Sequence, residues 1–534
     1  MKRPLGAQIS HMLKSRGVEV IFGIPGVHNV ELYRGIEEAG LTHVLARHEQ
    51  GAGFMADGYA RATGRPGVAF TITGPGLTNI LTPLGQAYSD SVPLLVISSC
   101  LDETAATRGQ LHQMRDQRAA AATVCDWSEE ARTAEAAYTL IDRALTEFQM
   151  DRSRPKHLQV PICLLGATAH SAPASDLETP SPILASGSTW IDDVASALAE
   201  ARRPLFIFGG GAVGNQSERF VEKVLDHYGA AAFTTYAGRG LVSPDYPLYF
   251  GSTLARPTSP DILKQSDLVI VVGASLDEVD LWRSELGHDC RLIRVDTDPE
   301  VLYDRHAADW PIRNDARDFM QTLTIHGLRL GGGESDWTPE DVAATRAHWR
   351  AEADAERPGI VPICDALRTC LPDDTMIYSD MTQFAYVAKE VWDMPRPGHW
   401  HHPTGFGTLG YAMPAAIGGA VARRAANLPT LAIAGDYGFQ YTLQELGTAV
   451  ELGLPLPILL WDNGRLKEIE DSMVASQIAP NAVVARNPDF LKLAAAYGAR
   501  AAQPATLAEL QRDVLTALRA DRPTLIRMTP ALTA

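Results

Sequence analysis

Two apolar runs near the C-terminal end of the chain each stop at a polar residue. Leu431–Ala434 leads to Asp436, and Pro457–Trp461 leads to Asn463. Apolar residues recur between the two runs at helical spacing: Leu443, Leu446 and Val450. This order predicts a strand, a helix and a second strand, and such a crossover makes the two strands parallel. The chain is therefore constrained to an α/β fold, in which helices cover the faces of a parallel sheet.

Asp436 and Asn463 follow the carboxyl ends of these two predicted strands. Parallel sheets bind their ligands at that edge, so the two side chains are expected to lie close together. Mg²⁺ prefers carboxylate, amide and carbonyl oxygens and often retains a phosphate group as a further ligand. Gly435 has no side chain, so a phosphate can approach the backbone beside Asp436. The pattern predicts a magnesium site, although polar caps on an ordinary pair of strands would look the same.

The rest of the sequence repeats this alternation of strand and helix patterns. A chain of 534 residues exceeds what one hydrophobic core supports, and its length predicts about three domains. Two stretches with little apolar periodicity divide it: a Pro-, Ser- and Ala-rich linker at 171–190, and a polar linker with an exposed helix at 327–357. We therefore predict three α/β domains with doubly wound parallel sheets, over residues 1–170, 190–325 and 358–534.

The charge and the apolar segments argue against several classes of function. A formal net charge of −17 disfavours a nucleic-acid partner, which requires a basic face. No apolar run reaches membrane-spanning length, and the N-terminal segment MKRPLGAQIS lacks the apolar core of a signal peptide. The six cysteines are scattered without CxxC or zinc spacing, which indicates mostly buried thiols in a reducing cytoplasm.

Three segments carry glycines and polar residues at junctions between strand and helix patterns. Glu49 lies in HEQGAGFMADGYAR, where the strand pattern His43–Ala46 changes to helical spacing. The segment TGRPGVAFTITGPGLTN follows, and it includes the glycine-rich stretch Gly74–Asn79. In the third predicted domain, the segment GFGTLGYAMPAA begins at Gly405. These junctions would lie at the ligand-binding edges of parallel sheets.

Together with the Asp436 region, these segments resemble the thiamine-diphosphate (ThDP) enzymes, in the group of the acetolactate synthases and 2-oxo-acid decarboxylases. The separation of Asp436 from Asn463, 463 − 436 = 27 residues, is typical of that family. The resemblance covers all three predicted domains and implies a pyrimidine-binding, a central and a diphosphate-binding domain. The chain departs from the family pattern at Tyr437, which replaces the last glycine of the usual GDG, and at Asp462, which replaces the first asparagine of a usual pair.

The resemblance also implies roles for particular residues. Glu49 matches the glutamate that activates ThDP: its hydrogen bond favours the imino tautomer of the aminopyrimidine, which then removes the C2 proton. Leu409 matches the bulky apolar residue that holds the two rings of the cofactor in a V shape. Mg²⁺ would be bound by Asp436, Asn463 and the carbonyl group of Arg465. The expected cofactor contacts are Pro25, Gly26, Asn79, Gly407, Thr408, Leu409, Gly435, Asp436, Tyr437 and Asn463.

A further loop, Gly109–Gln113, matches the family segment that brings a glutamine toward the thiazolium ring, and Gln113 is the match. His112 precedes it. Decarboxylases of this group carry histidines in this region, so His112 is a candidate proton donor. An exposed loop histidine is also commonly inert, and that alternative stays open.

The middle domain contains the pattern GxGxxG in Gly209–Gly214, directly after a predicted strand. This pattern alone is a weak signal of dinucleotide binding, because no acidic residue follows about twenty positions later. In the resembling family this domain binds FAD in some members and nothing in others. We therefore favour a structural domain over a flavin site.

Family members share the attack of ThDP on a 2-oxo acid and the loss of CO₂. The product is then released as an aldehyde, condensed with a second oxo acid, or oxidised. Glu468 follows Asn463 where family members place substrate-facing side chains, and a carboxylate there suits a cationic substrate tail or a proton transfer. It also suits a solvated acidic helix face.

We therefore expect a 2-oxo-acid decarboxylase, similar in particular to the 5-guanidino-2-oxopentanoate (2-ketoarginine) decarboxylases. The alternatives are an acetolactate-synthase-like carboligase and a catalytically idle ThDP-fold binding protein. In the family the cofactor lies between the pyrimidine domain of one subunit and the diphosphate domain of another. The resemblance thus implies a homodimer or homotetramer with shared active sites.

Overall fold

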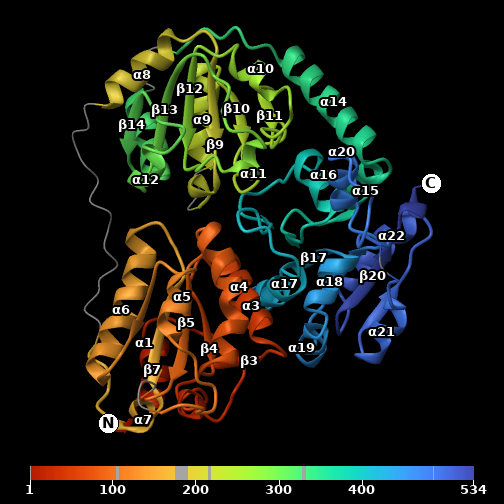
Figure 1. Cartoon of the computed structure of the whole chain (residues 1–534). Helices are drawn as coiled ribbons and strands as arrows, with labels where there is room; N and C mark the ends of the chain where they lie inside the picture. Colours follow the sequence, from red (N-terminus) through yellow and green to blue (C-terminus); the bar gives the residue numbers. More distant parts are fainter. Residues whose placement is uncertain are drawn as a thin grey trace.

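The structure, a computed structural model, describes residues 2–103, 107–174, 190–214, 218–327, 332–484 and 486–533. Three six-stranded parallel sheets, each covered by helices, follow one another along these ranges (Figure 1). This arrangement confirms the predicted α/β class with three doubly wound sheets. Most of the predicted linker at 171–190 lies outside the described residues. Among the helices of the described ranges, none combines the length and the apolar character that a membrane span requires.

The first sheet has the strand order β3-β2-β4-β5-β7-β6, and all neighbouring strands are parallel. Its strands are β2 (Val20–Gly23), β3 (Thr42–Leu45), β4 (Gly67–Thr71), β5 (Leu94–Cys100), β6 (Trp127–Glu130) and β7 (Lys156–Pro161). The main helices are α1 (Leu5–Ser15), α3 (Glu49–Thr63), α4 (Pro75–Ser89), α5 (Gln117–Ala122) and α6 (Ala134–Met150). The chain order reverses between β2 and β4, so the loops after these strands meet at the carboxyl edge of the sheet.

The second sheet has the order β11-β10-β9-β12-β13-β14 and is also entirely parallel. Its strands are β9 (Pro204–Phe208), β10 (Ala231–Thr234), β11 (Tyr249–Gly251), β12 (Leu268–Val272), β13 (Arg291–Asp296) and β14 (Trp310–Arg313). The main helices are α8 (Trp190–Glu200), α9 (Glu218–Tyr228), α13 (Ala316–Thr322) and α14 (Pro339–Glu356).

Helix α14 differs from the exposed helix that the polar composition of 327–357 predicted. Trp349 is buried, and its ring lies 6.0 Å from that of Phe233 and 6.1 Å from that of Phe250. Val342 is buried in the same cluster. The prediction was wrong for this face of the helix because a few large apolar residues can bury a face in an otherwise polar sequence.

The third sheet has the order β16-β15-β17-β18-β20-β19, again entirely parallel. Its strands are β15 (Met376–Ser379), β16 (Trp400–His401), β17 (Thr430–Gly435), β18 (Pro457–Trp461), β19 (Arg500–Ala502) and β20 (Thr524–Met528). The helices are α15 (Ile360–Cys370), α16 (Gln383–Val391), α17 (Ala412–Arg423), α18 (Asp436–Tyr441), α19 (Glu445–Glu451), α20 (Lys467–Ala475), α21 (Phe490–Ala496) and α22 (Leu507–Ala517). The single helix predicted after Asp436 is thus two short helices, α18 and α19.

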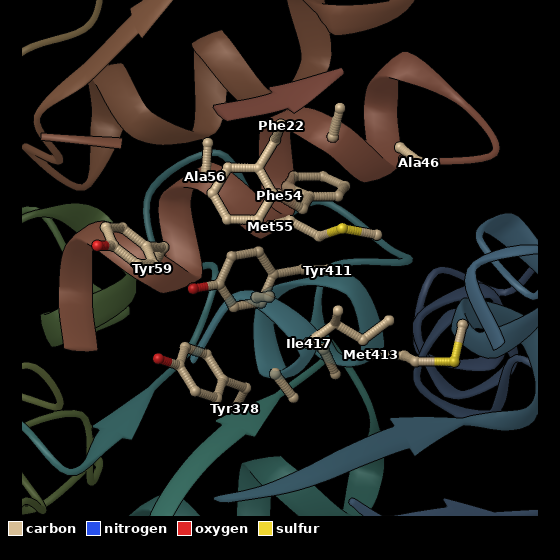
Figure 2. Packing of buried hydrophobic residues seen from close by; sticks show 14 of the residues in the cluster. Phe22, Ala46, Phe54, Met55, Ala56, Tyr59, Tyr378, Tyr411, Met413 and Ile417 are labelled. Atoms are coloured by element: carbon tan, nitrogen blue, oxygen red, sulfur yellow. The ribbon is translucent and has the colours of Figure 1, made fainter. Parts of the chain in front are cut away.

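The first and third domains share one hydrophobic core, in which α3 packs against α17 (Figure 2). The rings of Phe54 and Tyr411 lie 5.5 Å apart, edge to face. Glycines let the two helices approach closely: a Cβ atom on Gly58 would lie 1.9 Å from the carbonyl oxygen of Ala415. A Cβ atom on Gly418 would lie 1.9 Å from the carbonyl oxygen of Met55. This backbone contact fixes α3, which begins at Glu49, against the third domain.

Candidate active site

Glu49 is the first residue of α3 and lies at the carboxyl edge of the first sheet. Only 8% of its surface is exposed. Asn79, in the first turns of α4, donates a hydrogen bond of 2.9 Å from Nδ2 to Glu49 Oε2. Two residues predicted at the cofactor site are therefore in direct contact, and the amide fixes one oxygen of the buried carboxylate.

The loop after β2, which contains Pro25 and Gly26, packs against Ile72 near this carboxylate. A Cβ atom on Gly26 would lie 2.3 Å from Ile72 Cδ1, and one on Gly76 would lie 2.7 Å from Ile72 Cγ2 and 3.3 Å from Glu49 Oε1. The turn is closed by Asn29, whose Oδ1 accepts a 2.7 Å hydrogen bond from Gly26 N. The two glycines thus keep the space beside Ile72 and Glu49 free of side chains.

Glu445 of α19 supports the start of α3 from the third domain. Its Oε1 accepts hydrogen bonds from the backbone N–H groups of Arg47 (3.0 Å) and His48 (2.9 Å). Burial raises the pKa of Glu445 to about 7, against the effect of these hydrogen bonds. No local pattern in the sequence identifies Glu445 as a site residue, since its contact with Arg47 spans 398 positions.

His112 and Gln113 lie in the predicted loop, but their side chains make different contacts. The ring of His112 packs edge to face on that of His28, with centroids 4.8 Å apart. The Nδ1 atoms of both histidines are buried without a hydrogen-bond partner in the described structure. Burial, and then the neighbouring His112, lower the pKa of His28. Gln113 bonds within its own loop: Nε2 donates to the carbonyl oxygen of Thr107 at 2.7 Å, and Oε1 accepts from Gly109 N at 2.8 Å.

Asp436 and Asn463 lie at the carboxyl ends of the neighbouring strands β17 and β18, as their positions predicted. Asp436 is 3% exposed, and its Oδ2 accepts hydrogen bonds from Gly464 N (2.8 Å) and Asn487 Nδ2 (2.7 Å). Asn463 Nδ2 donates to Gln383 Oε1 at 2.9 Å. Asn487 and Gln383 are further polar residues of this edge that sequence patterns did not identify.

The backbone around Asp436 and Asn463 is tightly constrained. Tyr437 N donates to Asp436 Oδ1 at 2.9 Å, so Tyr437 replaces the usual glycine without loss of this contact. Gly435 packs closely on Thr382, since an added Cβ atom would lie 3.0 Å from its Oγ1. Arg465 N donates to Asn463 Oδ1 at 3.2 Å, which places the peptide of Arg465 beside the amide.

The carboxylates at the carboxyl edge of the third sheet leave a negative charge that suits a divalent cation. Asp462 is paired with Arg527 at 2.7 Å, whereas Asp436 forms no ion pair among the residues that the structure describes. Burial, with the neighbouring Asp462 as a further cause, raises the pKa of Asp436. No cluster of three or more His, Cys, Asp or Glu side chains suited to a metal occurs in the described ranges. A metal here would instead be bound by one carboxylate, one amide and a backbone carbonyl, a set that suits Mg²⁺.

The segment before α17 supplies Gly407, Thr408 and Leu409. Gly407 adopts φ 65°, which favours glycine, and Leu409 is half-buried. The Oγ1 atom of Thr408 is buried and has no hydrogen-bond partner in the described structure. An unpartnered buried hydroxyl is costly unless a ligand satisfies it, so this segment fits a bound cofactor.

The same segment is fixed by Asp380, which follows β15 and is fully buried. Its Oδ2 accepts a 2.9 Å hydrogen bond from Gly410 N. Burial raises the pKa of Asp380 to about 7. The loop that carries Leu409 is therefore held to the carboxyl edge of the third sheet.

Glu468, in the first turn of α20, is paired within the chain. Arg357, directly after α14, donates two hydrogen bonds to its carboxylate: Nε to Oε1 at 3.0 Å and Nη2 to Oε2 at 2.9 Å. Glu468 thus lies near Asn463 at the predicted edge, but a guanidinium of the same chain already contacts it. No local sequence pattern identifies Arg357, which is 111 positions away from Glu468.

The fold and this site define a class of enzyme that uses thiamine pyrophosphate. Three domain descriptions of the thiamine pyrophosphate enzymes match the chain: the N-terminal TPP binding domain over residues 3–120, the central domain over 191–323 and the C-terminal TPP binding domain over 380–528. The chain therefore belongs to the thiamine pyrophosphate enzyme family, which confirms the resemblance found in the sequence.

Individual relatives refine this assignment. The chain is 42% identical over 531 residues to a protein of Pseudomonas aeruginosa named probable 2-ketoarginine decarboxylase, covering 98% of this chain and 93% of that protein. It is 28% identical over 534 residues to the acetolactate synthase isozyme 2 large subunit of Escherichia coli, covering 98% and 95%. It is 27% identical over 537 residues to the acetolactate synthase large subunit of Haemophilus influenzae, covering 96% and 91%.

Proposed function

We propose that this enzyme decarboxylates a 2-oxo acid with a guanidino tail, 5-guanidino-2-oxopentanoate, to an aldehyde and CO₂, with ThDP and Mg²⁺ as cofactors. The observation that carries the proposal is the 42% identity, over nearly the whole of both chains, to the probable 2-ketoarginine decarboxylase. The acetolactate synthases are more distant, at 28% and 27% identity. The carboxylate of Glu468 near the site supports a substrate with a cationic tail.

ThDP, when bound, supplies the nucleophilic carbon and the electron sink that decarboxylation requires. Glu49 would hold the proton that is shared with the aminopyrimidine, and Asn79 would keep the carboxylate oriented for this task. Asp436, Asn463 and the carbonyl group of Arg465 would bind Mg²⁺ and so neutralise the diphosphate. Leu409 would pack against the cofactor, His112 is the candidate proton donor, and Gln113 is the residue expected to approach the thiazolium ring.

The alternative function is carboligation, as the names of the acetolactate synthase relatives describe for those proteins. One experiment separates the two: the purified protein is incubated with ThDP, Mg²⁺ and a panel of 2-oxo acids. Release of CO₂ with one equivalent of aldehyde supports the proposal, with 5-guanidino-2-oxopentanoate as the preferred substrate. Formation of a condensed hydroxy-oxo acid from two substrate molecules would replace it with the alternative.

We also propose that two subunits share each active site, so that the enzyme is a homodimer or homotetramer. Within the described chain, no hydrogen bond or ion pair joins the Glu49–Asn79 pair to the Asp436–Asn463 pair. A mixture of Glu49→Gln and Asp436→Ala subunits tests the proposal. If each cofactor contacts Glu49 of one subunit and Asp436 of the other, hybrids contain one intact site and regain part of the activity. Hybrids without activity would place both residues in the same subunit's site.

The enzyme is expected to act in the cytoplasm and without a flavin. All six cysteines are free, which suits a reducing compartment. A colourless preparation without flavin absorbance would agree with a structural middle domain, and a yellow one would contradict it.

A further inference from the structure

The three carboxylates of α20 all have basic partners, but one pair differs from the other two. Glu470 is paired with Arg465 at 3.1 Å, and Asp471 with Lys467, so both partners are close in sequence. Glu468 is paired with the distant Arg357. The side chains of Glu468 and Arg357 are 33% and 22% exposed, and two parallel hydrogen bonds join them. This pair therefore has the geometry of specific guanidinium recognition rather than of a local surface contact.

The environment of the guanidinium supports this view. The guanidinium carbon of Arg357 lies 6.0 Å from the centre of the Tyr386 ring on α16, so the cation faces both a carboxylate and an aromatic ring. Burial opposes the ionisation of Glu468, but the hydrogen bonds from Arg357 outweigh it and lower the pKa of Glu468. The two groups thus form a charged pair in a setting that also suits a free guanidinium compound.

This pair lies next to the candidate metal ligands. Gln383 lies close enough to Glu468 to contribute, after Arg357, to the lowering of its pKa, and Gln383 Oε1 accepts from Asn463 Nδ2 at 2.9 Å. Only one side chain therefore separates Glu468 from a residue expected to bind Mg²⁺. A substrate whose oxo group reacts at this edge of the sheet would have its tail near Glu468.

We propose that Arg357 occupies the binding position of the substrate's guanidinium, that the substrate displaces it, and that Arg357 thereby determines specificity for the tail. This inference rests on the proposed function. Exchange of one guanidinium for another keeps the partly buried Glu468 paired, so it avoids leaving an unpaired charge. A neutral tail gains no such contact and leaves the Glu468–Arg357 pair in place. The Glu468–Arg357 pair thus favours binding of a guanidino tail over binding of an apolar tail.

The displaced side chain has an alternative partner. Arg357 Nη1 already donates a hydrogen bond to Glu356 Oε2 at 3.1 Å, and the Glu356 side chain is 45% exposed. Arg357 also lies just beyond the last turn of α14, where its backbone is no longer helical. A rotation toward Glu356 and solvent would therefore free Glu468 without unfolding a helix.

The test uses the full chain with ThDP and Mg²⁺ and two ligands of similar shape, butylguanidine and the neutral butylurea. Arg357→Met removes the internal guanidinium and should tighten butylguanidine binding about tenfold in calorimetry, because the ligand no longer competes with it. Butylurea binding should not change. Lys467→Met removes a neighbouring pair on α20 and serves as the matched control, with both affinities unchanged. Arg357→Lys cannot form the bidentate contact with Glu468 and serves as a second variant if Arg357→Met does not fold. Its affinity for butylguanidine should lie between those of the wild type and of Arg357→Met.

Turnover provides the second readout. In Arg357→Met, kcat/KM for 5-guanidino-2-oxopentanoate should rise relative to that for 2-oxoisocaproate, chiefly through KM. Unchanged or weaker butylguanidine binding in a folded variant would overturn the inference, as would equal losses on both substrates. If the wild type decarboxylates no guanidino acid while Arg357→Met still gains affinity for butylguanidine, the proposed function fails and the guanidinium site stands.

Discussion

Replacement of Gly58 by alanine is expected to destabilise the enzyme and disturb the position of Glu49. The new Cβ atom would lie 1.9 Å from the carbonyl oxygen of Ala415, whereas Cβ atoms in proteins essentially never approach other heavy atoms within 3.0 Å. Helices α3 and α17 would have to separate locally by 3.0 − 1.9 = 1.1 Å. The Cβ position is fixed by the backbone of α3, and the carbonyl oxygen belongs to the main chain of Ala415, so no side-chain rotation can relieve the overlap.

The magnitude follows from the contacts at this crossing. Overpacking in a core costs about 1–3 kcal/mol. The Tyr378 hydroxyl donates to the carbonyl oxygen of Gly58 at 2.7 Å, and Tyr411 donates to Asp57 Oδ1 at 2.7 Å. Weakening these two buried hydrogen bonds adds about 1 kcal/mol each, and the better helix propensity of alanine returns about 1 kcal/mol. The net loss is about 2–4 kcal/mol, which should lower the melting temperature by about 5–15 °C.

Thermal unfolding at a fixed scan rate, followed by ThDP titration, measures both consequences. Gly166→Ala is the matched control, since an added Cβ atom there meets no atom within 4 Å, and its effect should stay within about 0.5 kcal/mol. An unchanged melting temperature for Gly58→Ala, or equal shifts in both variants, would refute the argument. It would mean that α3 and α17 are not held at the described separation.

Three further predictions concern single carboxylates. Glu49→Gln should retain ThDP but slow exchange of its C2 proton at least about a hundredfold, because only the proton relay is lost; exchange at the wild-type rate, followed by NMR, would contradict the assignment. Asp436→Ala should abolish Mg²⁺-dependent ThDP binding in a fluorescence titration, while the exposed Asp489→Ala should bind normally; equal affinities would remove Asp436 from the metal site. Glu445→Gln tests the pKa of about 7 that burial gives this carboxyl group. A raised pKa stabilises the folded state at low pH, and this contribution is lost as the pH rises through about 7. The stability deficit of Glu445→Gln should therefore shrink between about pH 5 and about pH 8, and a constant difference in melting temperature would exclude this account.

Local sequence patterns predicted the elements whose burial is continuous. The strand Pro457–Trp461 has the predicted bounds, because an apolar run that stops at polar residues leaves little freedom in a parallel sheet. The helix predicted after Asp436 is interrupted at Thr442. The Oγ1 of that residue donates to the carbonyl oxygen of Gly410 at 2.8 Å, a tertiary contact that helical periodicity does not contain.

Among the site residues, local patterns likewise predict some positions and not others. Glu49, Asp436 and Asn463 stand at strand ends, and topology alone brings such positions to one edge of a sheet. Their partners could not be predicted, because Asn487 reaches Asp436 across 51 positions and Arg357 reaches Glu468 across 111 positions. Those contacts depend on how loops and helices from separate segments pack, which no local pattern of residue types specifies.

The position of Glu49 depends on the third domain of its own chain at two points. Glu445 binds the N–H groups of Arg47 and His48 just before α3, and the glycine contact with α17 fixes the middle of the helix. Under the proposed sharing of sites, the cofactor that Glu49 activates is bound by the third domain of another subunit. Each third domain then orients the glutamate of one site and binds the cofactor of the other. A displacement in one such domain would therefore affect both active sites of a dimer, and the two sites would respond together to changes at the α3–α17 contact.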